Sequence, residues 1–276
     1  MEFFWNLYQS KVWVVPFLIY AIGILLFGSV TLLAIIIWTR HTHIKEQKFI
    51  LQYDRLIEPM LLNVLFDTGS YSTFNNDPHY SSLFNNTVFR KQMMANIINL
   101  HKNYEGSYAK KLEKFYLESH LITDSFRKLK NARWEIQCLA IEELSEMNVV
   151  TVFEHLVDTS KSSNKLLKIA AIKGCIKLNG TKGITHLIRH KDPLDQWSQL
   201  SIIDAIKHGD LRLTEGIEIL LTSKNDTVVS LGLKIIQSLH LSQHNLDIIR
   251  MISTTDNVYL KQEGQLTLTA IKSSNT

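Results

Sequence analysis

The stretch LLKIAAIKGCIKLNGTKGITHLIRH, residues 166 to 190, decides the fold class. Its apolar residues recur at intervals of three and four on both sides of a short interruption at Asn179 and Gly180. That recurrence predicts two amphipathic helices, and the interruption predicts the turn between them. The stretch contains lysine and arginine but no acidic residue, although the whole chain has 30 Lys and Arg against 26 Asp and Glu. We therefore interpret it as a helical hairpin with a local excess of positive charge.

The composition of the whole chain predicts an all-α protein. Only 4 prolines and 11 glycines occur among 276 residues, and no strand-like alternation persists over any length. A net charge of +4 lacks the concentrated basic face of a protein whose main partner is nucleic acid, so we expect no such partner. Cys138 and Cys175 lie inside apolar helical patterns and form no C-x-x-C pair, which predicts reduced core residues rather than a disulfide or a zinc site.

The helical hairpin recurs along the second half of the chain. Segments that begin at residues 131, 164, 196 and 227 each contain an apolar helical pattern, a short polar turn and a second, shorter helical pattern. A two-helix unit of this size cannot bury both of its apolar faces alone, so successive units are expected to stack. Small residues on the first helices would let neighbours approach closely; they are Ala170, Ala171, Ser201 and Gly232.

This pattern resembles HEAT-type repeats, the helix pairs of α-solenoids, over roughly residues 131 to 276. The last segment has one helix and no second, as expected of a terminal cap, and residues 87 to 121 could form one more divergent pair. The resemblance implies a solenoid of five or six units over residues 87 to 276. It also implies that the second helix of each unit lines the concave side, where partners of such proteins bind.

A membrane-spanning helix is predicted from Val12 to Trp38, a stretch of 27 residues without a charged side chain. At 1.5 Å per residue this helix spans roughly 40 Å, enough to cross a bilayer with tilt. The stretch is longer than the apolar region of a signal peptide, so we expect an uncleaved anchor. Trp13 and Trp38 near its ends, followed by Arg40, are the residue types that prefer the membrane interface.

The basic residues beside the span predict its orientation. They are Lys11 before it and Arg40, Lys45 and Lys48 after it. Because basic flanks stay in the cytoplasm, residues 1 to 11 are expected outside and the rest of the chain in the cytoplasm. Three Asn-x-Thr sequons, at Asn85, Asn179 and Asn225, would favour the opposite orientation, but so short a pattern often arises by chance.

Two further segments are expected between the span and the repeats. Residues 39 to 68 show helical periodicity and predict a juxtamembrane helix, with Pro59 as a kink or break. Residues 69 to 86 are rich in Gly, Ser, Asn and Asp without periodicity, which predicts a loop or linker. Its aromatic residues, Tyr71, Phe74, Tyr80 and Phe84, point to packing against another part of the protein.

Charge alternates along the repeats. Lys and Arg against Asp and Glu number 10 and 4 over residues 84–133, 0 and 6 over 134–160, 8 and 0 over 161–191, and 3 and 7 over 192–226. One interpretation is that neighbouring units attract each other and so fix their order. Another is a segmented docking surface for a charged partner. A third, limited to the basic segment of residues 90 to 133, is contact with an anionic membrane surface.

The candidate partner-binding residues lie on the second helices, where we expect them to share one face. They are His155 and Asp158, then His186, Arg189 and His190, then Glu218 and Thr222, and finally Asp247 and Arg250. A polar stripe of this kind would recognise a partner helix or tail by charge complementarity.

The sequence contains no constellation typical of catalysis. The pairs His186/His190 and His240/His244 have helical spacing, but no H-E-x-x-H motif and no clustered carboxylate completes a metal site. Phosphate-binding and nucleophile-elbow motifs are absent as well. We therefore expect a protein without enzymatic activity, cofactor or metal.

The expected function is that of a bacterial inner-membrane scaffold that docks a protein partner. Similarity to membrane-anchored HEAT proteins implies a partner such as a glycosyltransferase or another envelope enzyme. The alternatives are an anchored nucleic-acid-binding protein and a HEAT-like enzyme, of which a DNA glycosylase would require a basic groove along several units.

Overall fold

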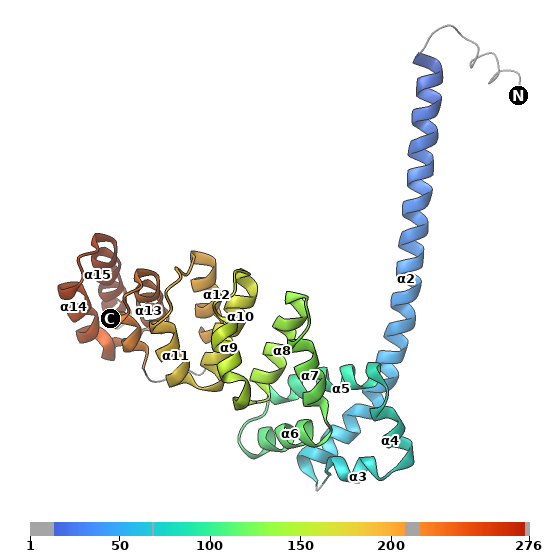
Figure 1. Ribbon diagram of the computed structural model, residues 1–276, viewed down its shortest axis with the longest axis horizontal. Coiled ribbons are helices and arrows are strands. Elements are labelled where there is room, and N and C mark those ends of the chain that lie inside the picture. The colour runs from blue at the N-terminus through green and yellow to red at the C-terminus, as the bar shows by residue number, and fades with distance from the viewer. Residues whose placement is uncertain (1–13, 68, 208–215, 274–276) are drawn as a thin grey trace, which may run out of the picture. The chain divides into compact units, whose positions relative to one another are not determined.

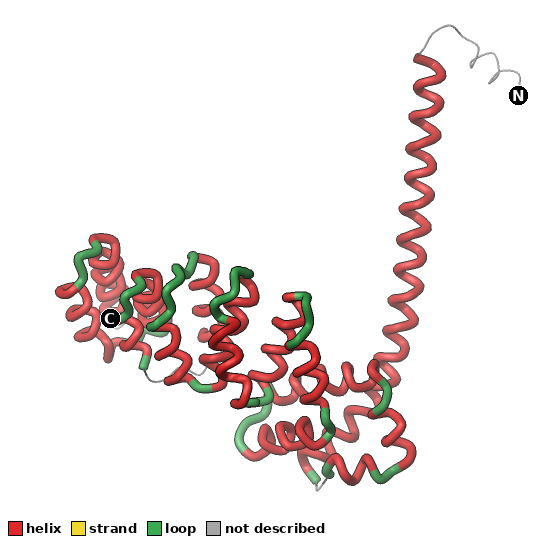
Figure 2. The backbone as a smooth tube through the Cα atoms, in the orientation of Figure 1, coloured by secondary structure: helices red, strands yellow, loops and turns green. Residues whose placement is uncertain are grey.

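The computed structural model describes residues 14–67, 69–207 and 216–273, and every regular element in these ranges is a helix (Figures 1 and 2). The prediction of an all-α protein is confirmed. The chain divides into two compact units, residues 1–60 and 61–276. Trp13 and the predicted external segment, residues 1 to 11, lie outside the described ranges.

The first described element is α2 (Val14–Phe66), a helix of 53 residues. Its segment Pro16–Arg40 is long and apolar enough to cross a membrane, and none of its most apolar part is buried in the protein. Large side chains such as Phe27 and Trp38 are more than 70% exposed there. In water such a helix would expose a large apolar area. In lipid its apolar side chains are removed from water, and the helix makes all of its backbone hydrogen bonds internally.

Helix α2 also covers the predicted juxtamembrane segment and continues through Pro59, so the expected break there is wrong. A proline inside a helix removes one backbone hydrogen bond and crowds the preceding turn. The residues that follow, Leu61, Val64 and Leu65, are almost completely buried. Their packing offsets the cost of the proline and holds the last turns helical.

The expected linker at residues 69 to 86 is largely helical, which corrects that prediction. It forms α3 (Tyr71–Asn75) and α4 (Pro78–Phe84). The physical reason is aromatic packing: the rings of Tyr71 and Phe84 meet edge to face with centroids 5.0 Å apart. Phe74 likewise packs on Phe115, with centroids 6.3 Å apart.

The remaining helices follow in chain order. They are α5 (Thr87–His101), α6 (Ser107–Glu118), α7 (Leu121–Leu129), α8 (Trp134–Glu146), η1 (Val150–Val152), α9 (Phe153–Thr159), α10 (Lys165–Leu178), α11 (Gly180–Ile188), α12 (Gln196–Lys207), η2 (Ile217–Thr222), α13 (Asp226–Ser238), η3 (Ser242–His244), α14 (Asn245–Thr254) and α15 (Val258–Ser273). Residues 87 to 121, where one more divergent helix pair is expected, contain the two helices α5 and α6, and α7 follows them.

Helices from α8 onward pack in chain order, as Figure 1 shows. The first helix of each repeated segment is α8, α10, α12 or α13, and α15 begins the last one. Each of these helices contacts the next: α8 with α10, α10 with α12, α12 with α13, and α13 with α15. The second elements pack beside them, α9 and α11 on α10, and η2 on both α11 and α14. Buried side chains from Ile172 to Ile271 form one continuous apolar core between these helices.

A capping residue recurs at the start of α10, α12, α13 and α15. Asn164 Oδ1 accepts hydrogen bonds from the backbone N–H groups of Leu166 at 3.0 Å and Leu167 at 3.1 Å. In the equivalent turns Asp195, Asn225 and Asn257 each accept a bond from a backbone N–H two or three residues later, and Asn131 accepts one from Arg133, the residue before α8. Such caps satisfy the free donors of a helix start. Because they recur every 30 to 33 residues, as their numbers show, they fix where each unit begins.

Two of these caps also join neighbouring units. Asn225 Nδ2 donates to the backbone oxygens of His190 and Asp192, at 3.0 and 2.9 Å. Asn257 Nδ2 donates to the carboxylate of Asp226 at 2.8 Å. The same side chain therefore starts one helix and holds the turn of the unit before it.

Glycines allow the closest approach between a first helix and the second helix that precedes it. A Cβ atom on Gly232 would lie 2.9 Å from Leu220 Cβ. On Gly174 it would lie 2.8 Å from Leu156 Cδ1, and on Gly264 2.8 Å from a side-chain carbon of Ile252. The expected role of Gly232 in close packing is confirmed, and Gly174 and Gly264 share it.

Replacing Gly232 with leucine should therefore destabilise the protein. The added side chain would collide with η2 and force a backbone shift, at a cost of roughly 1–3 kcal/mol for overpacking. The free energy of unfolding, measured by urea denaturation in detergent, should fall by that amount. Gln237→Leu, on a less buried position of the same helix, is the matched control and should change it by less than about 0.5 kcal/mol. Equal effects of the two variants would contradict close packing at Gly232.

Candidate partner-binding face and the Glu146 cluster

The predicted partner-binding residues all lie on or directly after the second elements. His155 and Asp158 belong to α9, Glu218 and Thr222 to η2, and Asp247 and Arg250 to α14; His186 lies on α11, which Arg189 and His190 follow. The structure differs from the sequence-based expectation at η2, which is a 3₁₀ helix rather than an α-helix.

Four of these residues line one cavity of about 510 Å³ between η2, α13 and α14. They are Glu218, Thr222, Asp247 and Arg250. Apolar side chains, among them Leu221, Met251 and Leu260, also line the cavity. A charged rim around apolar side chains is the usual composition of a protein recognition pocket.

Sequence reasoning missed His244, which organises the acidic side of this cavity. Its Nδ1 lies 3.3 Å from a carboxylate oxygen of Asp247 and 3.8 Å from one of Glu218. The spacing of three residues between His244 and Asp247 could have indicated the first contact. The second joins η3 to η2 and follows only from the tertiary structure.

The predicted residues of α11 divide between the surface and the interior. Arg189 is exposed, whereas His190 is only 5% exposed and its Nε2 has no hydrogen-bond partner within the described structure. His186 lies between these extremes, with its Nε2 2.8 Å from Ser160 Oγ. Burial lowers the pKa of both histidines, which favours neutral rings at neutral pH. His190 therefore faces the interior of the protein rather than solvent.

Residues from oppositely charged blocks meet where neighbouring helices pack. Lys102 contacts Glu142 at 3.0 Å, Lys165 contacts Asp195 at 2.8 Å and Lys168 contacts Asp192 at 3.3 Å. Lys128 contacts Glu143, and Lys177 contacts Glu146. These pairs support the interpretation that the alternating charge fixes the order of the units. The exposed pairs contribute little individually, and the pairs with buried glutamates matter most.

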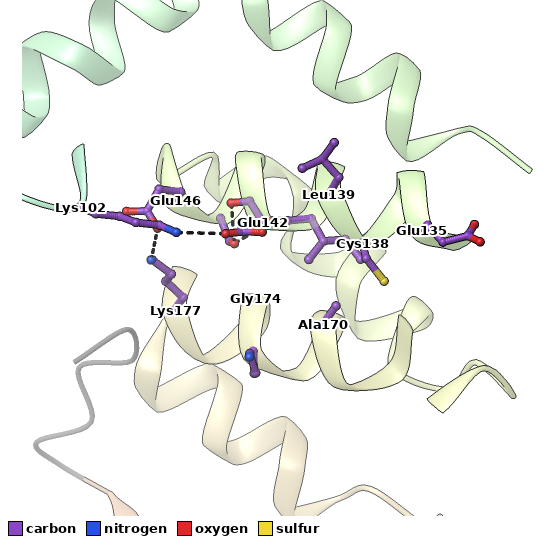
Figure 3. Close-up of a pocket in the computed structure, with 12 residues that line it drawn as sticks. Lys102, Glu135, Cys138, Leu139, Glu142, Glu146, Ala170, Gly174 and Lys177 are labelled. Carbon is purple, nitrogen blue, oxygen red and sulfur yellow. Dashed lines mark hydrogen bonds and ion pairs between the residues drawn. The ribbon is translucent and has the colours of Figure 1, made fainter. Parts of the chain in front are cut away.

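Glu146 is the most constrained of these carboxylates. It lies between two cavities, one of about 450 Å³ between α8 and α10 and one of about 400 Å³ beside α5 and α6. In Figure 3, Lys102, Glu142, Glu146 and Lys177 gather at one end of the first cavity, and Glu135 and Cys138 lie at the other. The side chain of Glu146 is 5% exposed and binds Lys177 of α10.

His101, at the end of α5, bridges Glu146 to a third helix. Its Nδ1 lies 3.1 Å from Glu146 Oε1, and its Nε2 lies 3.2 Å from Glu113 Oε1 of α6. Because both ring nitrogens face carboxylate oxygens, the doubly protonated imidazolium fits this site best. The cluster therefore connects α5, α6, α8 and α10 through charged hydrogen bonds.

The pKa values of the cluster reflect these contacts. The hydrogen bond to Glu146 raises the pKa of His101 above its ordinary value, against the lowering effect of burial. Burial alone would raise the pKa of Glu146, but hydrogen bonds from His101 and Lys177 outweigh it and lower that pKa. These contacts therefore favour the charged form of both groups.

The cysteines show no sign of chemistry. Cys175 is buried, which raises the pKa of its thiol to about 12, and Cys138 is half-buried with a raised pKa. A thiol with so high a pKa stays protonated and unreactive at neutral pH. Among the residues that the structure describes, no group of three or more His, Cys, Asp or Glu is arranged to hold a metal ion.

Comparison with protein-family models, with curated proteins and with solved structures gave no match. The class of protein is therefore defined by its own structure. Over the ranges that the structure describes, it is all-helical and has one helix, near the N-terminus, that is long and apolar enough to cross a membrane.

The stability of the protein should depend on pH through His101. Because folding raises its pKa, the stabilisation is complete below the unfolded value of about 6.5 and is lost as pH rises through the higher folded value. Glu146 behaves oppositely: its stabilisation is complete above about pH 4.5 and is lost as pH falls through its lowered pKa.

Melting temperatures of the wild type and His101→Gln, measured in detergent from pH 5 to 9, test this. At pH 5 to 6 the wild type should melt at a higher temperature than His101→Gln. This difference in melting temperature should shrink as the pH rises. His155→Gln is the control, because the exposed His155 side chain makes no hydrogen bond within the described structure. A difference between wild type and His101→Gln that stays constant over this range would contradict a charged His101 bridge.

Proposed function

We propose that the chain is a membrane-tethered docking platform for a protein partner. In this proposal α2 anchors the protein in the membrane, and the helices from α8 onward form a HEAT-like solenoid. The second elements present the docking surface. The single observation that carries the proposal is the cavity between η2 and α14, whose charged and apolar lining is described above.

The arrangement of the helices supports a solenoid. Each first helix packs on the next, and the capping residues recur every 30 to 33 residues. Repeat proteins have this order because each unit buries its apolar faces only against its neighbours. Such stacking leaves an extended face of second helices, which is suited to holding a segment of another protein.

The cavity supports protein binding more than small-molecule chemistry. Glu218 and Asp247 carry negative charge, Arg250 is exposed and positive, and Met251 contributes adaptable apolar surface. Mixed charges of this kind provide specificity and orientation for a partner. The carboxylates are partly engaged by His244, so the partner would meet a prearranged site.

The orientation and location form part of the proposal. The charges beside the span favour residues 1 to 11 outside and the helices after α2 in the cytoplasm. A bacterial inner membrane, and a glycosyltransferase or other envelope enzyme as partner, rest on the resemblance to membrane-anchored HEAT proteins alone.

The docking site can be tested by crosslinking in intact membranes. A photo-reactive residue at Thr222 should capture one dominant protein, identified by mass spectrometry. Capture should fall at least tenfold, a cost of about 1.4 kcal/mol, when Asp247→Lys and Arg250→Glu are combined, because the partner then meets reversed charges. Arg127→Glu, an exposed charge reversal on α7, should leave capture unchanged. Capture that is diffuse, or insensitive to the double reversal, would count against this surface.

The anchor is tested by replacing two exposed residues near the middle of the span. Leu25→Arg and Phe27→Arg together should cost roughly 5–7 kcal/mol of insertion free energy and release the protein from membranes on carbonate extraction. Leu25→Ala and Phe27→Ala, which keep the segment uncharged, should leave it membrane-bound. Retention of the double arginine variant in the membrane would argue against a spanning helix.

A further inference from the structure

The cavity between η2, α13 and α14, which we call the η2–α14 cavity, has an apolar lining that is almost completely buried. The side chains of this lining come from η2, α13, α14 and α15, and they are Leu221, Val229, Met251 and Leu260. Pockets of about 300 to 1,000 Å³ typically hold a small ligand, so a cavity of about 510 Å³ can receive a few side chains of a partner segment. An apolar side chain would gain from entering it, because it would leave water.

Negative charge prevails among the ionisable residues that line the η2–α14 cavity. They are three carboxylates and one guanidinium, those of Glu218, Asp226, Asp247 and Arg250. Within the described structure, none of the three carboxylates pairs with a lysine or an arginine; their contacts are with His244 and Asn257. The side chain of Arg250 is exposed and forms no ion pair there either. The acidic groups of the lining are therefore open to a cation from another molecule.

The charged residues of the two flanking turns leave this balance as it is. Lys224, in the turn before α13, is exposed and adds one positive charge. Asp256, in the turn before α15, is exposed, forms no ion pair within the described structure and adds one negative charge. These two charges cancel. The excess of carboxylates in the lining therefore decides which sign of charge the cavity attracts.

Glu218 and Asp247 mark the position where a cation would bind. Nδ1 of His244 lies 3.3 Å from a carboxylate oxygen of Asp247 and 3.8 Å from one of Glu218, so side chains of η2 and α14 converge on a single ring nitrogen. One ring nitrogen carries at most one hydrogen, and 3.8 Å is too long for a hydrogen bond. The Glu218 carboxylate therefore keeps its capacity to accept hydrogen bonds from a partner.

We infer that the partner segment bound in the η2–α14 cavity carries an arginine that donates to Glu218 and Asp247, beside an apolar residue that enters the apolar lining. A guanidinium has five donors in a planar fork and is weakly hydrated, so it can serve two carboxylates at once. Attraction to the acidic lining would also orient the segment as it approaches. This assignment rests on the proposed function and specifies the chemistry of the partner.

An acidic segment or a purely apolar one fits the cavity less well. An acidic segment would bring further carboxylates beside Glu218, Asp226 and Asp247, and only Arg250 of the lining could receive them. A purely apolar segment would remove the same carboxylates from water without giving them a hydrogen-bond donor. A basic segment with an apolar neighbour avoids both costs.

Binding of synthetic peptides to the full chain in detergent tests this assignment. The probe is a fluorescent peptide of arginine and leucine, and its counterpart has glutamate in place of every arginine. Fluorescence anisotropy measures binding, and empty detergent micelles are the blank. The arginine peptide should bind roughly tenfold more tightly than the glutamate peptide, because only the arginine peptide complements the acidic lining.

Variants of the cavity separate specific recognition from general attraction. Glu218→Gln combined with Asp247→Asn should weaken binding of the arginine peptide roughly tenfold, because the acceptors of the guanidinium lose their charge. Arg250→Gln should leave that binding unchanged or strengthen it, whereas a misfolded cavity would weaken binding in both variants. Glu58→Gln combined with Glu135→Gln removes two exposed carboxylates outside the cavity and should have little effect.

Equal binding of the two peptides, absence of binding, or full affinity in the variant without the Glu218 and Asp247 charges would overturn the assignment. A crosslink from Thr222 that maps by tandem mass spectrometry to an acidic segment would also overturn it, although the capture itself would uphold the proposed function. Specific binding of the arginine peptide without any captured protein in membranes would contradict the proposed function and uphold the preference of the cavity for arginine. The two failures are therefore distinguishable.

Discussion

The fold depends on one constraint: a short helix pair has two apolar faces and can bury only one of them by itself. Burial of the other requires contact with neighbouring helices, and α8, α10, α12, α13 and α15 contact one another in sequence. The continuous core from Ile172 to Ile271 is the result of that dependence. Gly174, Gly232 and Gly264 let the helices come close enough to complete it. The residues that could contact other molecules lie on surfaces that this stacking leaves open.

Polar groups set the positions at which the stacked helices begin and meet. Asn164, Asn225 and Asn257 cap α10, α13 and α15, and Asn225 and Asn257 also hold the turn of the unit before. At the other end of the array, Glu146 accepts hydrogen bonds from His101 and Lys177 and so connects helices that are distant in sequence. A buried carboxylate is costly unless its partners are in place, so these contacts favour one arrangement of the helices over others.

The sequence predicted part of the candidate site, and the reason is periodicity. Repeats place equivalent residues at equivalent positions, which assigns Glu218, Thr222, Asp247 and Arg250 to second helices, and the structure gathers all four around one cavity. His190 was placed on the same face by the same rule, yet it is buried, because the chain turns away from helical geometry after Ile188. Periodicity predicts which face of a helix a residue occupies only for residues inside that helix.

By itself the sequence determined the all-helical class and the apolar helix near the N-terminus. These are local properties, which hydrophobic periodicity, turn residues and uninterrupted apolar length encode directly. Only the tertiary structure decided that α3 and α4 form between residues 71 and 84 and that His101 bridges Glu113 and Glu146. Each of these depends on side chains brought together across tens of residues. Local sequence patterns do not encode such contacts, because the contacts form only when the helices have packed.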